Sequence, residues 1–243
     1  MSRSRWIVVG IVLCLLGGLL LPAVQRIRDG EGWVRCSVSL RQIGQALLQY
    51  ERTYGQLPPA VVVGKSGEPL YSWRVVILPF LDEQGLYKQF KLDEPWDSAH
   101  NKTLLAQMPP VYVPALEARE PPYATHFQVF VGHSTAFEHE GLTLADFPDG
   151  LANTILVVEA REPVPWTKPA DLTYDADKPI PALGGLSSKP THFLGYEVNR
   201  KPGFCAVFAD GSTRFISNRI NEKTLRSLIT RNGSEDVDLS KLE

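Results

Sequence analysis

Cysteine is scarce in this sequence, with three residues in 243. That number is too small for a scaffold built on disulfides, and the positions Cys14, Cys36 and Cys205 match no zinc-binding spacing. An excess of one charge is missing as well, since 25 lysine and arginine residues face 27 acidic ones for a net charge of -2. The chain therefore lacks a global basic field, and we expect no nucleic-acid partner.

Motifs of several enzyme classes are also missing. The sequence contains no phosphate-binding loop, no dinucleotide fingerprint and no Gly-x-Ser-x-Gly nucleophile elbow. Ser134, a histidine and Asp149 could be drawn as a triad, but spacing alone does not establish the hydrogen bonds that a triad needs. We therefore expect a protein that is not an enzyme and that has no cofactor. Hydrophobic residues make up 44% of the chain, enough for a folded core.

A long apolar run near the N-terminus is the most informative feature that is present. Residues 6–24 carry no charge and are flanked on both sides by arginines. These nineteen residues, as a helix, would span about 28 Å, close to the hydrocarbon thickness of a bilayer. We expect an uncleaved single-pass anchor after a short tail of residues 1–5, and a cleaved signal peptide is the alternative.

A second helix is predicted after the anchor. Apolar residues recur every three or four positions across residues 33–55, which is typical of an amphipathic helix, here a stem that ends at Gly55. Its apolar face consists of Cys36, Leu40, Ile43, Leu47, Tyr50 and Tyr54. This face needs a partner, and we expect residues 56–243 to provide it as one globular domain.

The globular part mixes short strands with short helices. Strands are predicted where β-branched and aromatic residues cluster, at residues 60–63, 73–78, 127–131, 154–159, 204–208 and 213–216. Helices are predicted at residues 82–90, 97–108 and 221–231, and residues 162–190 are expected to form a long surface loop. Asp210-Gly211 predicts a hairpin turn between the last two strands. Because the strands come in groups, the order favours an α+β fold with a mainly antiparallel sheet.

One predicted loop, residues 133–140, carries residue types that bind metals. It contains His133, Glu138 and His139, but the two histidines are six positions apart, which fits neither a helical nor a same-strand pair of ligands. We expect solvated side chains and no metal here. The alternative is an extracytoplasmic ligand- or metal-binding module, enzymatic or not, that uses the His133–Glu140 loop.

Several longer stretches stand in a specific order along the chain. They are LRQIGQALLQYERTYGQLPP (40–59), YSWRVVILPFLDEQGLYKQF (71–90), EPWDSAHNKTL (94–104), FPDGLANTILVVEA (147–160), VPWTKP (164–169), FADGSTRFI (208–216) and LRSLITRNGSE (225–235). Together they resemble a large bacterial family, the domain of unknown function fifteen fifty-nine, which is described as similar to type II secretion pseudopilins. The family has no settled biochemical activity.

The resemblance implies a location and a kind of partner. It implies an N-terminal helix anchored in the inner (cytoplasmic) membrane and a pilin-like α+β domain on the extracytoplasmic side. It also implies a role in secretion or surface assembly, with pseudopilin-like or secretion-apparatus proteins as partners. We therefore expect a single-pass, pseudopilin-like membrane protein that acts by binding or assembly.

The chain departs from the family's pattern at three places. The family's prepilin leader, a Gly before Phe-Thr-Leu-Ile-Glu, is missing, since Arg5 runs directly into the apolar segment. The family's Cys-Pro is Val113-Pro114 here, so Cys36 lacks its usual partner. In the signature around the Asp210-Gly211 turn, Arg200 takes the position of the family's histidine.

Two alternatives remain open for Cys36 and Cys205. In an oxidising compartment they could form a disulfide, which would close a loop of roughly 170 residues and contribute about 4–5 kcal/mol in the chain-entropy model. They could also be two separately buried thiols, because free cysteine often behaves as a small hydrophobic residue.

Overall fold

The computed structural model describes residues 33–113, 122–184, 191–193, 196–198 and 202–233. The predicted tail and anchor, Cys14 and Arg200 lie outside these residues. In the described part of the chain, no helix has the length and apolar character needed to cross a bilayer.

The stem helix is the first described element and covers residues 33–54. Its predicted apolar face is buried over most of its length, since Cys36, Leu40, Ile43 and Leu47 are at most 3% exposed and belong to the main core. Tyr54 was wrongly predicted to share this burial. It is the last residue of the helix and is 60% exposed, with its ring near those of Tyr50 and Phe80.

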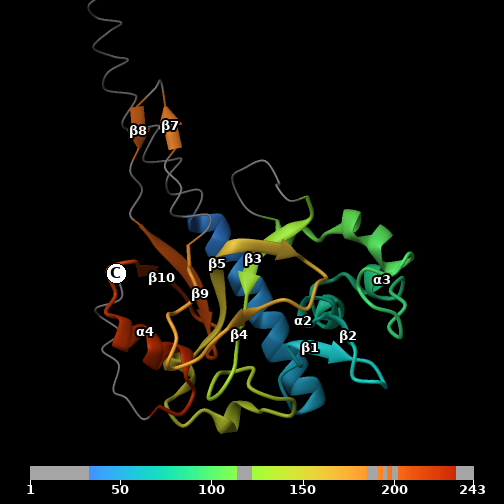
Figure 1. Cartoon of the computed structure of the whole chain (residues 1–243), viewed down its shortest axis with the longest axis horizontal. Coiled ribbons are helices and arrows are strands. Elements are labelled where there is room, and N and C mark those ends of the chain that lie inside the picture. The colour runs from blue at the N-terminus through green and yellow to red at the C-terminus, as the bar shows by residue number, and fades with distance from the viewer. Residues whose placement is uncertain (1–32, 114–121, 185–190, 194–195, 199–201, 234–243) are drawn as a thin grey trace, which may run out of the picture.

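The helix packs on a four-stranded antiparallel sheet with the order β10-β9-β5-β3 (Figure 1). The strands are β3 (Ala124–Gln128), β5 (Ile155–Pro165), β9 (Gly203–Phe208) and β10 (Thr213–Ser217). Alternate residues of β9 face opposite sides of the sheet, since Cys205 and Val207 belong to the cluster that contains the stem helix, whereas Phe204 and Phe208 belong to a second cluster. The predicted α+β class with a mainly antiparallel sheet is confirmed.

Helix α4 (Glu222–Ile229) belongs to this second cluster, so the sheet lies between two helices (Figure 1). Asn221 caps the helix, because its side chain accepts a hydrogen bond from the backbone N–H of Lys223 at 2.8 Å. Leu225, Leu228 and Ile229 are the residues that α4 buries in the cluster.

The remaining elements are short. The strands are β1 (Val61–Val63), β2 (Pro69–Ser72), β4 (Phe130–Val131), β6 (Leu172–Thr173), β7 (Thr191–Phe193) and β8 (Tyr196–Val198). The α-helices are α2 (Trp73–Val76) and α3 (Gln84–Tyr87), and the 3₁₀ helices are η1 (Leu78–Phe80), η2 (Asn101–Gln107), η3 (Pro110–Tyr112), η4 (Leu144–Asp146) and η5 (Leu151–Asn153). β1 pairs with β2 and β7 with β8 antiparallel, whereas β4 pairs with β6 in parallel.

Three helix and strand predictions in the first half of the chain are wrong. Residues 73–78 form α2 and the start of η1 instead of a strand, because Ser72 accepts a hydrogen bond from the backbone N–H of Arg74 and begins a helix there. Residues 97–108 form only the 3₁₀ helix η2, and the Asn101 side chain bonds backward to the carbonyls of Lys91, Glu94 and Pro95. Residues 82–90 contain a single helical turn, α3.

The surface loop predicted at residues 162–190 is also wrong at its start. β5 continues to Pro165, because β3 pairs with it there through Ala124↔Pro165 and Thr125↔Val164. Trp166 follows directly and is fully buried, and its indole N–H donates to the carbonyl of Leu105 at 3.1 Å. This part of the chain is therefore core rather than surface.

Gly44 determines how closely the stem helix approaches β9. A Cβ atom at this position would lie 2.6 Å from Cγ2 of Val207, whose β-branched side chain is fully buried. We expect Gly44→Ala to lower the free energy of unfolding by about 1–3 kcal/mol, because overpacking outweighs the higher helix propensity of alanine. Urea unfolding measures the change.

The matched control is Gly85→Ala in α3, where an added Cβ meets nothing within 4 Å. We expect this variant to be neutral or stabilised by up to about 1 kcal/mol. Equal destabilisation of both variants would show that the contact with Val207 does not limit the helix–sheet distance.

Candidate functional site

Three polar side chains meet between the stem helix and the sheet. Cys36 lies on the buried face of the helix, Glu159 on β5 and Cys205 on β9, and these residues are 3%, 0% and 1% exposed. Their two sulfurs and a carboxylate oxygen all lie within 4.8 Å of one another. We call these residues the cysteine cluster. The structure therefore brings together the two cysteines that sequence reasoning considered as a pair, and it adds a carboxylate that this reasoning missed.

Glu159 bridges the two cysteines. Its Oε2 accepts a hydrogen bond from the backbone N–H of Cys205 at 3.1 Å and one from the thiol of Cys36, with Sγ at 3.7 Å. The antiparallel pairing of β5 with β9 runs from Ile155↔Phe208 to Val158↔Ala206. Glu159 follows Val158 on β5 and Cys205 precedes Ala206 on β9, so the two residues are neighbours at this end of the pairing. The one signal for this role in the sequence is an acidic residue that directly follows the apolar run ILVV.

The surroundings keep the Cys36 thiol protonated. A hydrogen bond with Cys205, burial and the negative charge of Glu159 together raise the pKa of Cys36 well above its ordinary value. A thiol must lose its proton to act as a nucleophile, so this site is poorly suited to nucleophilic catalysis.

Two kinds of chemistry remain for the cysteine cluster. The two thiols could be oxidised to a disulfide, or two thiolates and the carboxylate could ligate zinc, for which they supply three of the usual four donors. Across residues 33–113, 122–184 and 202–233, no other group of three His, Cys, Asp or Glu side chains has its donor atoms close enough to hold a metal ion.

A family model described as "Protein of unknown function (DUF1559)" matches residues 34–127. Residues 34–127, called the DUF1559 segment below, are therefore similar to this family. The matched segment includes the stem helix and the predicted family stretches at 40–59, 71–90 and 94–104, and it ends within β3. Searches of curated proteins and of solved structures gave no match. Cys36 thus belongs to the DUF1559 segment, whereas Glu159 and Cys205 lie beyond it.

The His133–Glu140 loop, which lies outside the DUF1559 segment, makes different contacts from those that a metal site needs. The ring of His133 is at the surface, with Nδ1 2.8 Å from Oε1 of Glu138. The other oxygen of Glu138 accepts a hydrogen bond from Arg231 at 2.6 Å, and Nδ1 of His139 lies 2.8 Å from the carbonyl oxygen of Glu140. Glu138 therefore ties the loop to the chain that follows α4.

The charge of Glu138 is stabilised by this arrangement. Partial burial alone would raise the pKa of Glu138, but hydrogen bonds from His133, Arg231 and the backbone of Ser134 lower it below its ordinary value. The ionised carboxylate is thus engaged with a guanidinium, which favours a structural role for this loop.

The Asp210-Gly211 turn joins β9 and β10 as predicted. Gly211 has a left-handed φ of 82°, and the side chain of Asp210 accepts a hydrogen bond from the backbone N–H of Ser212 at 2.8 Å. Arg200, which takes the position of the family's histidine before this turn, lies outside the described residues.

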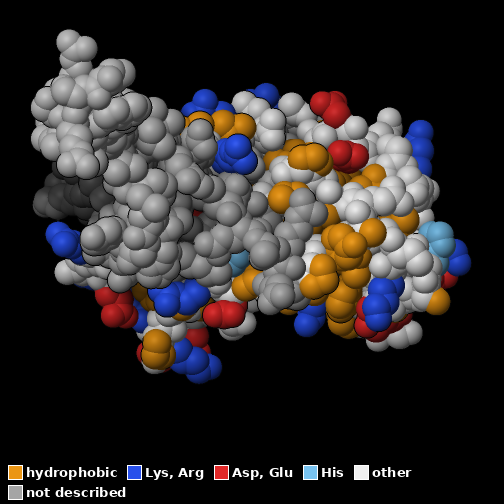
Figure 2. All heavy atoms as spheres, turned by 90° about the horizontal axis from the view of Figure 1, so that it is seen from above, with side chains coloured by type: hydrophobic (Ala, Val, Ile, Leu, Met, Phe, Trp, Pro, Cys, Tyr) orange, Lys and Arg blue, Asp and Glu red, His pale blue; other side chains and the backbone are white. Residues whose placement is uncertain are grey.

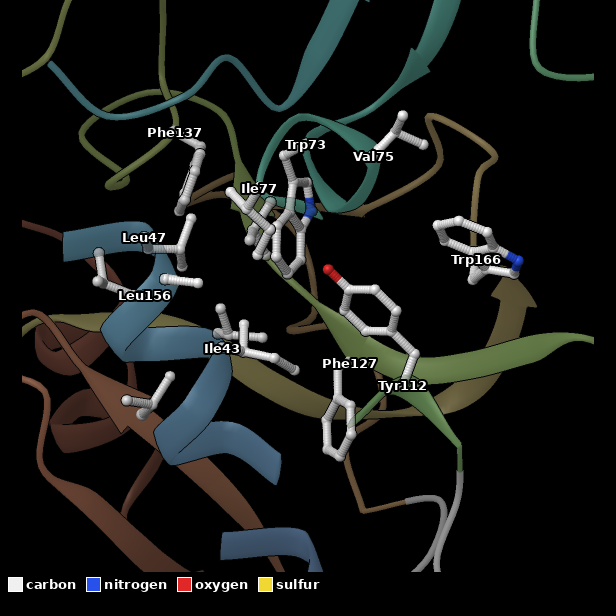
Figure 3. Packing of buried hydrophobic residues seen from close by; sticks show 14 of the residues in the cluster. Ile43, Leu47, Trp73, Val75, Ile77, Tyr112, Phe127, Phe137, Leu156 and Trp166 are labelled. Carbon is white, nitrogen blue, oxygen red and sulfur yellow. The ribbon is translucent and has the colours of Figure 1, made fainter. Parts of the chain in front are cut away.

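A buried ion pair between Arg74, in the DUF1559 segment, and Asp171, beyond it, was not predicted. Nη2 of Arg74, on α2, lies 2.7 Å from Oδ1 of Asp171, and the two side chains are 0% and 1% exposed. Arg74 also donates to the carbonyl of Phe127 at 2.8 Å, and its own carbonyl accepts the hydroxyl of Tyr112 at 2.9 Å. Figure 3 shows the Tyr112 hydroxyl directed towards this part of the core, with the ring of Trp166 beside it. The pair connects α2 to β3 and to the loop before β6.

Proposed function

We propose that this chain is a membrane-anchored, pseudopilin-like protein that acts in secretion or surface assembly by binding rather than by catalysis. The apolar run at residues 6–24 is its single-pass anchor in a bacterial inner membrane, and the described domain lies on the extracytoplasmic side. The match of residues 34–127 to the DUF1559 family model supports this proposal at the coarse level of a domain of unknown activity.

The arrangement of the stem helix is the observation that carries the proposal. One long helix lies on one face of an antiparallel sheet, which is the arrangement that a pilin-like resemblance leads us to expect. The helix is buried along one stripe, yet its first turns expose Trp33, Val34 and Val38 by 44%, 48% and 50%. These side chains follow the end of the proposed anchor, Val24, by 9 to 14 residues. Tryptophan is favoured near a membrane surface.

The surface of the domain is consistent with a protein that has partners. Figure 2 shows apolar side chains gathered on one face of the molecule. Apolar surface of this kind is typical of contact with a protein or a membrane, so we infer that the domain acts by binding through it.

Membrane extraction of the full chain tests the anchor. We expect the chain to stay in the membrane pellet after carbonate treatment, because about nineteen apolar residues match the bilayer core. A variant without residues 6–24 should move to the supernatant. A Val38→Ser variant is the matched control and should remain in the pellet. Release of the full chain would overturn the proposal, and mass spectrometry of its N-terminus would then show whether cleavage near Val24 is the cause.

Protease access tests the side of the membrane. With a tag at the C-terminus, external protease should remove the tag in cells whose outer barrier has been opened, while the inner membrane stays intact. A tag that is digested only after the inner membrane is lysed would place the domain in the cytoplasm and contradict the proposal.

A photoreactive residue at position 38 tests assembly. We expect cross-links from Val38 to a second copy of this chain or to another pseudopilin-like chain, identified by mass spectrometry. Arg52 is the matched control, because it lies on the same helix and is exposed, but at the end farther from the anchor. Cross-links of equal yield from both positions would show that the first turns of the stem helix are not a specific contact surface.

A further inference from the structure

We propose that Cys36 and Cys205 form a disulfide that fastens the stem helix to the central strand β9. The two residues are 3% and 1% exposed, and their sulfurs lie within 4.8 Å of each other across the helix–sheet boundary. Oxidation would therefore need only a local shift of two side chains that already face each other. In cells the cross-link rests on the proposed extracytoplasmic location, because disulfides persist in oxidising compartments.

The position of the two cysteines within their elements makes the cross-link effective. Cys36 lies in the first described turn of the stem helix, near the end that would connect to the anchor, and Cys205 lies within β9, which pairs with both β5 and β10. Farther along the same helix, Gly44 comes close to Val207, two residues from Cys205 on the same face of β9. The disulfide would hold the exposed end of the helix on the sheet, so that a load on the anchor reaches the core of the domain.

The oxidant is a protein or small molecule that carries a reactive disulfide. One cysteine thiolate attacks a sulfur of that disulfide, which forms a mixed disulfide and expels the first thiolate of the oxidant. The second cysteine thiolate then attacks the cysteine sulfur of the mixed disulfide and expels the second thiolate. The two cysteine protons end on the released thiols, and two electrons pass from the cysteine pair to the oxidant.

This exchange precedes complete docking of the stem helix. In the folded domain the thiols are buried and Cys36 is held in its protonated form, so an oxidant has neither access to it nor a thiolate to react with. Before docking, an oxidant can reach both cysteines, and Cys36 is free of the surroundings that raise its pKa. The same burial that blocks oxidation of the folded domain would afterwards protect the disulfide from reductants.

Zinc is the competing occupant of the cysteine cluster, and the geometry favours it less. The cluster offers three donors instead of the usual four, and the carboxylate already accepts the backbone N–H of Cys205. A disulfide is neutral and leaves the hydrogen bond between Glu159 and Cys205 intact.

Thiol trapping of the full chain tests the proposal. Cells that express a Cys14→Ser variant, which removes the third cysteine, are quenched in acid, and the unfolded chain is alkylated with a maleimide. We expect neither Cys36 nor Cys205 to be labelled before reduction and both to be labelled after it, with a peptide pair that joins the two residues in the mass spectrum. The Cys36→Ser variant is the matched control, and its Cys205 should be labelled without reduction.

A second measurement separates the cross-link from the location of the domain. The purified full chain is unfolded, refolded in glutathione buffers of increasing oxidising strength, and alkylated. If the disulfide forms in oxidising buffer but the thiols are free in cells, the extracytoplasmic location is wrong, whereas the ability of the two cysteines to form the cross-link is supported. Free thiols in both experiments would overturn the cross-link.

Metal analysis of the same preparations addresses zinc directly. We expect less than stoichiometric zinc in the purified chain, and we expect Glu159→Gln to form the disulfide like the parent. One zinc ion per chain that is lost in Glu159→Gln, with both cysteines reduced, would overturn the proposal in favour of a metal site.

Discussion

Replacement of Arg74 by methionine is expected to lower the free energy of unfolding by about 3–5 kcal/mol, because it leaves a buried charge without its partner. Oδ1 of Asp171 accepts hydrogen bonds from Nη2 of Arg74 at 2.7 Å, the indole N–H of Trp73 at 3.2 Å and the backbone N–H of Val129 at 3.0 Å. The guanidinium is the only cationic group among these three donors. Urea unfolding of the parent and the variant measures the loss.

The loss should depend on pH in a defined direction. Burial raises the pKa of Asp171, whereas the charge of Arg74 and the hydrogen bonds to Asp171 act against this rise. Without Arg74 the folded-state pKa rises further above that of the unfolded chain, so the folded state binds a proton more readily. The stability of the variant then falls as the pH rises through this interval, and the loss should be larger at about pH 8 than at about pH 5.

The double variant Arg74→Met/Asp171→Leu is the control for this interpretation. Replacing both members of a buried ion pair by apolar residues removes the uncompensated charge, so we expect it to recover a large part of the stability lost in the single variant. The pH dependence described above should disappear as well. A double variant as unstable as Arg74→Met would show that the guanidinium acts mainly through its bonds to Phe127 and Ser72.

The elements that could be predicted from the sequence are those whose signals are local. The stem helix has an apolar repeat over more than five turns, the β9–β10 hairpin has an Asp-Gly turn, and α4 has an Asn cap before its apolar residues. In each case neighbouring residues contain the information. The same holds for the α+β class, which follows from the grouping of the strands.

The errors occurred where distant parts of the chain determine local structure. Residues 73–78 have strand-like composition, but Arg74 among them pairs with Asp171, which lies 97 positions away. Asn101 replaces a regular helix by backward bonds to a preceding loop. Asp171 and Trp166 lie in a segment rich in proline and charge, which is typical of a surface loop, yet both are buried because β3 and the loop around η2 cover them. Contacts between residues so far apart in the sequence cannot be predicted from a local pattern.

In the candidate site, the pair of cysteines could be proposed from the sequence, but the glutamate beside them could not. Two cysteines in one chain can be proposed as a pair without any structure, and the structure places Cys36 and Cys205 together. Glu159 could not be assigned to the pair, because a glutamate after an apolar run is compatible with an exposed strand end. Only the register of β5 against β9, and the packing of the helix above them, brings its carboxylate to the Cys36 thiol and the Cys205 backbone N–H.

Reduction of the Cys36–Cys205 disulfide is expected to lower the free energy of unfolding by about 5 kcal/mol, an effect comparable to that of Arg74→Met. The disulfide would close a loop of roughly 170 residues, and in the chain-entropy model the stabilisation grows with the logarithm of the loop length because the unfolded chain loses freedom. Urea unfolding of the full chain with and without a dithiol reductant measures the difference. Cys14→Ser is the parent for this comparison, so that no third thiol can exchange.

The matched control for this measurement is Cys36→Ala in the same parent. It cannot form the cross-link, so its free energy of unfolding should be the same with and without reductant and should lie near that of the reduced parent. The stem helix should also respond locally, because the disulfide would fasten its first described turn. Reduction should accelerate the exchange of amide hydrogens around Leu40 more than that of amide hydrogens in α4, which the cross-link does not touch. If the reductant changes neither the free energy of unfolding nor the amide exchange of the parent, the helix is held on the sheet by packing alone.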